Sequence, residues 1–394
     1  MKLSANRFKV RGDKILWIVY IVFLLISLLE VYSTMGKMVY EKNEGDLVGM
    51  FLKHTGILLS GLLITYIVHL IKYRFYSGYT KIAYVFSVGL LAMTLVMGGG
   101  NEANRWIQLP FIQFQPSEIA KYILVLYVAN ELAIMKESGI RDRKNFFVLL
   151  GKIAIVCVLI FFDNFSTAVL IFTGCYIMLF VAGARLKDIL TPIVPLVIAI
   201  VVILLIQPDF LKRSETWNNR IEIFLNSDKE EINQPNIAKM AIATGGIMGK
   251  GIGNTTQGRF LSESHNDFIF AIILEELGII ACIVILGLYA ILIHRAVIIA
   301  KKAKGLFGRY TAIGIGCMIF LQAVVNMLVA TGAAPVTGQT LPFISYGGTS
   351  LWITSVALGV LQNISAGSKE IEQSSEQTDL ESEKIDLESE KLES

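Results

Sequence analysis

The chain has few charged residues for its length. Lysine, arginine, aspartate and glutamate make up 17% of its 394 residues, whereas hydrophobic residues make up 54% and the mean hydropathy is +0.61. An average soluble domain is about one-quarter charged, so this composition excludes an ordinary soluble protein and predicts a polytopic membrane protein. The basic residues fall where membrane topology predicts them, which gives no support to nucleic-acid binding.

Cysteine is also scarce. The four cysteines lie inside apolar runs, without the close spacing of a metal site, and are Cys157, Cys175, Cys282 and Cys317. They are expected to pack as small hydrophobic residues and do not indicate a redox compartment. The first apolar run lacks a small-residue cleavage site, so residues 15–34 are predicted to span the membrane rather than to form a removable signal peptide.

Ten apolar runs are long enough to cross the hydrocarbon core of a bilayer. They lie near residues 15–34, 49–71, 82–98, 117–135, 146–162, 165–183, 188–207, 267–293, 309–331 and 346–366. An even number of spans places both termini on one side, and the basic loops identify that side as cytoplasmic. The predicted fold is therefore an all-α polytopic membrane protein with ten transmembrane helices.

The ends of the chain and its longest loop complete the predicted layout. Residues 1–14 are expected to be cytoplasmic, residues 15–366 to form the membrane domain, and residues 208–266 to form a long extracytoplasmic loop between helices 7 and 8. Residues 367–394 contain no aromatic residue and are rich in Glu, Ser and Lys, which predicts a disordered acidic cytoplasmic tail. A seven-residue repeat in this tail leaves open a short helix on a partner.

Two helical patterns and a glycine-rich stretch make up the long loop. Apolar residues recur at helical spacing within 217–225, which predicts an amphipathic helix at the membrane interface. A second short helical pattern covers 237–244, and closely spaced glycines follow from Gly245. Loops of this length usually have a function, and here a flexible glycine-rich chain is predicted to lead into the next motif.

That motif, HNDFIFAIILEELG from His265, places one aspartate and two adjacent glutamates at the start of an apolar helix. Carboxylates at or below a membrane surface are costly, so each requires a partner or a function. Glu275 and Glu276 lie about 12–14 Å beyond Asp267 along an ideal helix and are expected to pair with polar groups of neighbouring helices. Asp267 is the candidate reactive group, although position alone equally allows Asn266 or Asp267 to cap the helix.

The second outer loop, NRWIQLPFIQFQPSEIAK from Asn104, supplies further candidate residues. Arg105 and Trp106 precede two prolines, and Glu118 and Lys121 lie in the first turns of the next helix. A spacing of three places this last pair on one helix face, either as a functional intramembrane pair or as a neutralised pair that closes a helix contact. Trp106 could equally be an interfacial belt residue.

The last outer turn, PVTGQTLPFISYGGTS from Pro335, is rich in proline, glycine and hydroxyl side chains. Irregular backbone at membrane depth is tolerated only where it is buried in protein or lines a cavity. The segment therefore indicates either a polar cavity near the outer face or a close helix contact that the glycines allow.

These motifs together resemble the SEDS family, the FtsW, RodA and SpoVE group of cell-wall polymerases. The resemblance covers nearly the whole membrane part and rests on four segments in the expected order. They are NRWIQLPFIQFQPSEIAK, GGIMGKGIGN from Gly245, HNDFIFAIILEELG and PVTGQTLPFISYGGTS. Four ordered motifs are far more specific than one short pattern. The opening GDKILWIVYIVFLLISLLEVYS from Gly12 is more similar to FtsW than to RodA.

The resemblance implies a peptidoglycan glycosyltransferase that polymerises lipid II into glycan strands at the outer face of the bacterial cytoplasmic membrane during cell division. The implied partners are lipid II, which is an undecaprenyl-diphosphate-linked disaccharide peptide, a class B penicillin-binding protein, other divisome proteins and membrane lipids. The family's essential loop aspartate falls on Asp267, its loop tryptophan on Trp106 and its intramembrane pair on Glu118 and Lys121. The alternatives are a lipid II flippase, a non-enzymatic division scaffold, and a role in elongation instead of division.

Polymerisation needs a base that takes the proton from an acceptor hydroxyl, and positive charge that stabilises the departing diphosphate. Asp267 is the predicted base. The candidate cations for the diphosphate are Arg105, Lys250, Arg259 and Lys121. The sequence shows no metal-ligand spacing and leaves open whether a divalent cation, Mg²⁺ or Mn²⁺, assists them.

One position departs from the family pattern. Where the family commonly has an aspartate before a small hydroxyl-containing run, the chain reads DNFSTA from Asp163 and has Asn164. A role for that carboxylate is therefore in doubt in this chain, unless Asp163 replaces it from one position earlier.

Overall fold

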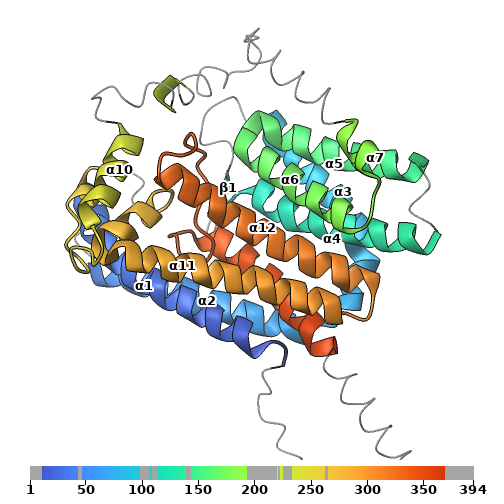
Figure 1. The fold of residues 1–394 in the computed structure, drawn as a ribbon, viewed down its shortest axis with the longest axis horizontal. Coiled ribbons are helices and arrows are strands. Elements are labelled where there is room, and N and C mark those ends of the chain that lie inside the picture. The colour runs from blue at the N-terminus through green and yellow to red at the C-terminus, as the bar shows by residue number, and fades with distance from the viewer. Residues whose placement is uncertain are drawn as a thin grey trace, which may run out of the picture.

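Long helices packed side by side make up the structure, which is a computed structural model (Figure 1). It describes residues 11–42, 47–97, 106–108, 113–138, 143–192, 220, 222–224, 233–261 and 265–368. Several sequence predictions lie outside these residues: Arg105, most of the seventh span, most of the amphipathic helix at 217–225, and the acidic tail beyond residue 368.

Apart from the seventh, each predicted span corresponds to a helix. These helices are α1 (Lys14–Lys42), α2 (Leu47–Leu70), α3 (Tyr73–Met97), α4 (Pro116–Ser138), α5 (Arg143–Asp163), α6 (Phe165–Val181), α11 (Ile269–Lys302), α12 (Leu306–Ala330) and a last helix at 348–368. In the described part of the chain, six helices are long and apolar enough to cross a membrane: α1, α2, α3, α5, α11 and α12. The short α7 (Leu186–Leu190) lies where the seventh span is predicted to begin.

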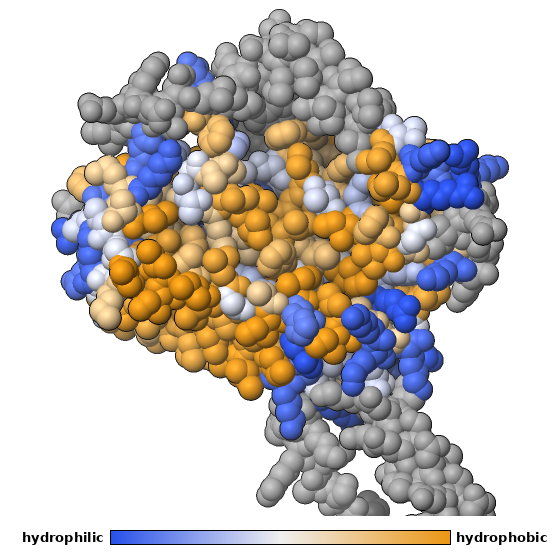
Figure 2. All heavy atoms as spheres, in the orientation of Figure 1, coloured by the Kyte–Doolittle hydropathy of each residue, from blue (hydrophilic) through white to orange (hydrophobic). Residues whose placement is uncertain are grey.

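The surface of these helices is that of a membrane protein. Large apolar side chains are exposed along several helices, including Ile18 at 61%, Leu52 at 61% and Val85 at 69%. Figure 2 shows hydrophobic residues across the centre of one face, with hydrophilic residues gathered toward its edges. Exposing apolar surface to water costs about 25 cal/mol per Å², whereas lipid tails solvate it. The chain is a multi-pass membrane protein, and the count of ten spans stays a prediction.

Helix α12 occupies the middle of the bundle. It packs against α11 on one side and against α4 and α6 on the other (Figure 1). Two of its residues, Gln322 and Asn326, carry amide side chains that are only 1% exposed. A spacing of four places both amides on one helix face, and buried amides require hydrogen-bond partners. This polar stripe in an apolar helix connects the segments of the candidate site.

The two ends of the described membrane domain are joined to each other. The backbone N–H of Asp13 donates to Oε1 of Gln362 (2.8 Å), and Nε2 of Gln362 donates back to the carbonyl of Asp13 (3.1 Å). The Asp13 carboxylate also accepts from the N–H of Leu16 and pairs with Arg295 of α11. The start of α1 and the end of the last helix therefore lie on the same side of the bundle. That this side is cytoplasmic stays a prediction.

The connecting segments contain elements that position the site. A short antiparallel hairpin, β1 (Ile107–Gln108) and β2 (Gln113–Phe114), precedes α4 and was not expected from the sequence. The second helical pattern of the long loop is confirmed as α10 (Gln234–Gly245), which is followed by the 3-10 helix η2 (Gln257–Arg259). Residues 222–224, within the predicted amphipathic segment, are helical.

Candidate functional site

Asp267 lies half-buried in the turn that leads into α11. Phe268 occupies the N-cap position of this helix, so neither Asn266 nor Asp267 is the N-cap residue that the alternative interpretation required. The backbone carbonyl of Asp267 accepts a hydrogen bond from Nδ2 of Asn326 (2.8 Å). Its carboxylate faces Gly338, where an added Cβ would lie 3.7 Å from Oδ2. The backbone of Asp267 is thus held in place, and its carboxylate adjoins a residue without a side chain.

The irregular segment 335–347, here named the 335–347 loop, packs directly against the residues around Asp267. The N–H of Tyr346 donates to the carbonyl of His265 (2.9 Å), and the hydroxyl of Ser345 donates to the carbonyl of Asn266 (2.7 Å). Phe343 holds a φ of 66°, a conformation that costs a non-glycine residue about 1–3 kcal/mol and that the surrounding packing must stabilise. The loop is therefore a defined support for Asp267.

A further hydrogen-bonded chain connects this loop to α6. Asn326 donates to the carbonyl of Gln339 (2.7 Å), and the Gln339 side chain donates to the hydroxyl of Thr167 (2.6 Å). The N–H of Thr167 in turn donates to Oδ1 of Asn164, which is the N-cap of α6. Asparagine and aspartate cap helices about equally well, so Asn164 can fulfil a capping role without the carboxylate that the family commonly has there. The side chain of Asp163 lies outside the described residues.

Glu118 and Lys121 form the predicted pair on one face of α4, with 2.9 Å between Nζ and Oε2. Lys121 is fully buried and also donates to Oε1 of Gln322 (2.6 Å). Nε2 of Gln322 donates onward to the carbonyl of Thr340 (3.0 Å), while the hydroxyl of Ser350 donates to Glu118 (3.2 Å). The ion pair is therefore joined through α12 to the loop that supports Asp267.

The amides that connect these groups were missed in the sequence. Gln322 and Asn326 stand four residues apart in an otherwise apolar helix, and Gln339 lies in the last outer turn. The spacing of these two polar residues in the sequence could have identified them, because polar side chains in a membrane helix face the bundle interior rather than lipid. Together with Asp267, Glu118 and Lys121 they form one connected polar network.

Three other predicted substrate-binding residues have no hydrogen bond to this network within the described residues or lie outside the described part of the chain. Arg259 is exposed in η2 and forms no ion pair with any residue that the structure describes. Trp106 is half-buried immediately before β1, in the hairpin that leads to α4. Arg105 lies outside the described residues. The predicted substrate contacts of these three residues stay predictions.

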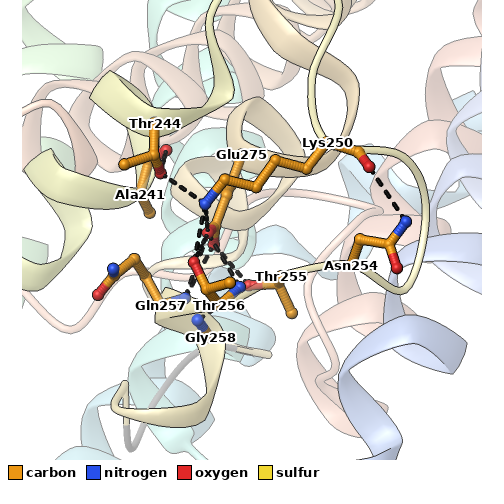
Figure 3. Close-up of polar contacts among 9 residues, drawn as sticks. All are labelled: Ala241, Thr244, Lys250, Asn254, Thr255, Thr256, Gln257, Gly258 and Glu275. Carbon is orange, nitrogen blue, oxygen red and sulfur yellow. Dashed lines mark hydrogen bonds and ion pairs between the residues drawn. The ribbon is translucent and has the colours of Figure 1, made fainter.

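Lys250 is bound to Glu275, as Figure 3 shows. Its ammonium group donates to Oε1 of Glu275 (2.6 Å) and to the hydroxyls of Thr244 (2.9 Å) and Thr256 (2.7 Å). Glu275 also accepts from the hydroxyl of Thr255 (2.5 Å) and from the N–H of Thr256 (3.0 Å). All three ammonium hydrogens therefore have protein acceptors. A contact between Lys250 and a diphosphate stays a prediction, and it would require Lys250 to leave Glu275.

Backbone contacts lock the glycine-rich stretch to a break in α11. The helix is interrupted at Gly278, whose φ is 73°. The N–H groups of Lys250 and Gly251 donate to the carbonyls of Glu275 (3.0 Å) and Glu276 (2.8 Å), which are therefore satisfied outside the helix. An added Cβ at Gly249 would lie only 2.2 Å from the carbonyl oxygen of Glu276. The sequence predicted a flexible chain, but these glycines instead allow two backbones to approach closely.

The side chain of Glu276 contacts α1. Its Oε1 accepts a hydrogen bond from the hydroxyl of Ser33. Glu30 of α1 lies within electrostatic range of Glu276, and both side chains are fully buried. Neither carboxylate oxygen of Glu30 has a hydrogen-bond partner among the described residues. In the sequence, Glu30 could have been recognised as the one acidic residue inside the first apolar run, since such residues usually face the interior of the helix bundle.

The described part of the chain contains no ready-made cluster of metal ligands. Within the described ranges, no three or more histidine, cysteine, aspartate or glutamate side chains lie close enough together to hold a metal ion. A divalent cation would therefore have to be held by fewer protein ligands together with the substrate's own oxygens, or by residues outside these ranges.

Comparison with known proteins adds a family match over nearly the whole chain. Residues 13–370 match the family FTSW_RODA_SPOVE, described as cell cycle protein. A probable peptidoglycan glycosyltransferase FtsW from Trichlorobacter lovleyi is 35% identical, over 91% of this chain and 94% of that protein. Stage V sporulation protein E from Bacillus subtilis is 32% identical, over 92% of this chain and 99% of that protein.

Solved structures agree with the family match. A chain from "Structural coordination of polymerization and crosslinking by a peptidoglycan synthase complex" is 26% identical and superposes with a TM-score of 0.73, over 91% of this chain and 98% of that chain. The rod shape determining protein RodA from Thermus thermophilus is 24% identical with a TM-score of 0.65, over 90% of this chain and 96% of that chain. The similarity to this RodA structure shows only that the two proteins share a fold.

Proposed function

The chain belongs to the FtsW, RodA and SpoVE family, as the four motifs predicted, and we propose that it is a peptidoglycan glycosyltransferase of FtsW type. It polymerises lipid II into glycan strands at the outer face of the cytoplasmic membrane during cell division. Relatives named peptidoglycan glycosyltransferase FtsW, similar over about nine-tenths of the chain, support the activity.

Asp267 is the general base of this reaction. Its carboxylate takes the proton from the acceptor sugar hydroxyl while the oxygen attacks the anomeric carbon of the donor. The bond between that carbon and the diphosphate breaks, and the diphosphate leaves with the electron pair. A positioned base contributes about 10²- to 10⁴-fold in rate. The observation that carries this assignment is the carboxylate facing Gly338, on a backbone that Asn326 holds.

Glu118 and Lys121 position the reacting groups. Lys121 is fully buried and Glu118 is 7% exposed, so neither presents its charge to a substrate in this arrangement. Their hydrogen bonds to Gln322, which in turn contacts Thr340 in the 335–347 loop, and to Ser350 in the last helix connect the pair to the segment beside Asp267. Rigid support of this kind lowers the reorganisation needed to reach the transition state.

The assignments of Trp106 and of the partner follow the family, whereas those of Arg105 and Arg259 follow from the negative charge of the diphosphate. Trp106, Arg105 and exposed Arg259 are proposed substrate contacts. A class B penicillin-binding protein is the proposed partner that crosslinks the strands, and a peptidoglycan synthase complex among the similar structures supports this pairing. Divisome proteins and membrane lipids are the other proposed partners.

The test is a gel assay of glycan products from purified lipid II. Wild type and Asp267→Ala are compared in the presence of the class B penicillin-binding protein. Wild type is expected to give a ladder of strands and Asp267→Ala none. A matched variant distant from the site, Lys301→Gln, should give the wild-type ladder. Strands of normal length from Asp267→Ala would overturn the catalytic assignment.

A parallel liposome assay separates the alternatives. A flippase moves labelled lipid II across the bilayer and makes no strands, and a scaffold does neither while still binding its partner. Either result from folded wild-type protein would overturn the proposed activity.

A further inference from the structure

Two large apolar side chains lie exposed on the turn that follows α10, which is residues 246–253 and is here named the 246–253 turn. Met248 is 82% exposed and Ile247 is 70% exposed, more than any other large apolar side chain in the described part of the chain. Water solvates such side chains poorly, and adjacent exposed apolar residues mark a surface that contacts a membrane or a partner. The 246–253 turn is therefore a candidate interaction surface.

The backbone of the turn is held in place, so its two exposed side chains keep their positions. The N–H of Ile279 donates to the carbonyl of Gly246 (3.1 Å), and the N–H of Lys250 donates to the carbonyl of Glu275 (3.0 Å). The Lys250 side chain reaches back to the Glu275 carboxylate (2.6 Å), as Figure 3 shows. The polar groups of the turn thus lie against α11, and its apolar side chains are left on the outside.

The exposed residues of the turn continue the apolar surface of α11. Ile279 and Ile280 directly follow the break in this helix and are each 51% exposed, and Ile283 is 66% exposed. The backbone of Ile247 lies against the break itself, since an added Cβ at Gly278 would stand 2.3 Å from the carbonyl oxygen of Ile247. The exposed apolar face of a spanning helix contacts lipid. The turn therefore extends a lipid-facing surface.

The turn also lies at the depth where the hydrocarbon layer ends. Asp13 pairs with Arg295 at one end of α1, and the hydroxyl of Ser33 donates to Glu276 near the other end. The stretch from Asp13 to Ser33 is about 30 Å long at the rise of an ideal helix, and the hydrocarbon core is about 30 Å thick. Because the charged pair marks one surface of this layer, the Ser33–Glu276 contact and the break beside it lie near the other surface.

We propose that Ile247 and Met248 insert into the lipid leaflet beside the break in α11, so that the 246–253 turn anchors the long loop in the membrane. In the proposed topology this is the outer leaflet. The partner is the upper part of the acyl chains, since amphipathic segments bury their apolar face about 5–10 Å into the boundary between headgroups and chains. Anchoring at this point fixes the level of Asp267 relative to the membrane surface, because the first turns of α11 connect it to the break. The insertion does not depend on the reaction that the protein catalyses.

The test measures lipid contact at single positions. Full-length Met248→Cys, carrying an environment-sensitive NBD fluorophore, is placed in phosphatidylcholine nanodiscs, and the emission of native cysteines, measured on wild type labelled in the same way, is subtracted. The emission is expected to fall when the lipids carry a spin label near the headgroup and to fall less when the spin label is at the end of the acyl chain. Iodide in the water should have little effect. Ile247→Cys should respond in the same way.

Two matched positions calibrate the measurement. Asn254 is exposed just beyond the turn, and its side chain donates to the carbonyl of Lys250 (3.1 Å). Emission from labelled Asn254→Cys should be quenched by iodide and little affected by spin-labelled lipid. Labelled Ile283→Cys, on the lipid-facing side of α11, should lose most emission to the spin label at the end of the acyl chain. The melting temperature of each labelled variant should match wild type, because all four side chains are replaced at the surface.

The outcomes separate lipid from other occupants of this surface. Quenching by iodide at both turn positions, as strong as at Asn254→Cys and without any loss to spin-labelled lipid, would overturn the proposal. Lipid contact that disappears when the class B penicillin-binding protein is added would also overturn it, because the surface would then be a protein interface. Quenching by spin-labelled lipid that persists in that complex would support the membrane anchor.

Discussion

The side-chain amide of Asn326 donates a 2.8 Å hydrogen bond to the backbone carbonyl of Asp267. The same amide group donates a 2.7 Å hydrogen bond to the carbonyl of Gln339. One residue of the central helix therefore fixes both the proposed base and the loop opposite it. The orientation of the Asp267 carboxylate depends on a residue that need not touch the substrate.

Asn326→Leu is predicted to lower kcat for strand synthesis with little change in KM. The substitution leaves two carbonyls without their donor, and misplacing a reacting group by about 1 Å can cost about 100-fold in rate. A fall of about 10- to 100-fold is expected on this basis. Steady-state turnover of lipid II measures it. An increase in KM at unchanged kcat would contradict the positioning role.

Lys121→Met is predicted to destabilise the protein strongly. The substitution leaves the Glu118 carboxylate buried without its cation, which typically costs about 3–5 kcal/mol. The double variant Glu118→Gln/Lys121→Met removes both charges and should recover much of this loss. Unfolding of wild type, Lys121→Met, Glu118→Gln and the double variant in detergent, monitored by circular dichroism, gives the comparison. A double variant as unstable as the sum of its single variants would reject the coupling.

Gly249→Ala is predicted to be much more damaging than Gly253→Ala. Both glycines have a positive φ, 74° and 82°, so both substitutions carry a similar backbone strain of about 1–2 kcal/mol. Only at Gly249 would the new methyl group also collide with a backbone oxygen, that of Glu276 at 2.2 Å, whereas nothing lies within 4 Å at Gly253. Melting temperatures of the two variants test this difference. Equal decreases in melting temperature would show that the close approach of Gly249 to α11 does not contribute to stability.

Glu30→Met is predicted to leave the protein as stable as wild type or to stabilise it by about 1–3 kcal/mol, the usual cost of a buried polar group without a partner. Glu276→Met is the matched variant and should destabilise, because Glu276 accepts a hydrogen bond from Ser33. Free energies of unfolding of both variants check the prediction. A loss of more than about 1 kcal/mol in Glu30→Met would mean that Glu30 has a stabilising partner.

The sequence predicted the helices well because their signals are local. A run of apolar residues as long as a bilayer is thick specifies a spanning helix wherever it occurs, and α10 was equally visible in its spacing of apolar residues. The pairing of Glu118 with Lys121 followed from helical geometry alone. The β1–β2 hairpin was missed, since two-residue strands leave almost no pattern.

The site depends on contacts between distant segments, which a single sequence does not specify. Gly249 was read as a source of flexibility because a close neighbour such as the Glu276 carbonyl cannot be seen in the sequence. Lys250 was assigned to a ligand because its carboxylate partner lies 25 residues away. Asp267 could be chosen only because a family motif surrounds it.

The central claim is that the Asp267 carboxylate is the base of a polymerisation reaction. The most direct measurement is kcat of Asp267→Asn with purified lipid II, made alongside the melting temperature of the variant. Asparagine preserves size but cannot take the proton, so kcat should fall about 10²- to 10⁴-fold while the melting temperature stays at the wild-type value. A kcat within about threefold of wild type in the folded variant would contradict the account, because a general base contributes far more than that.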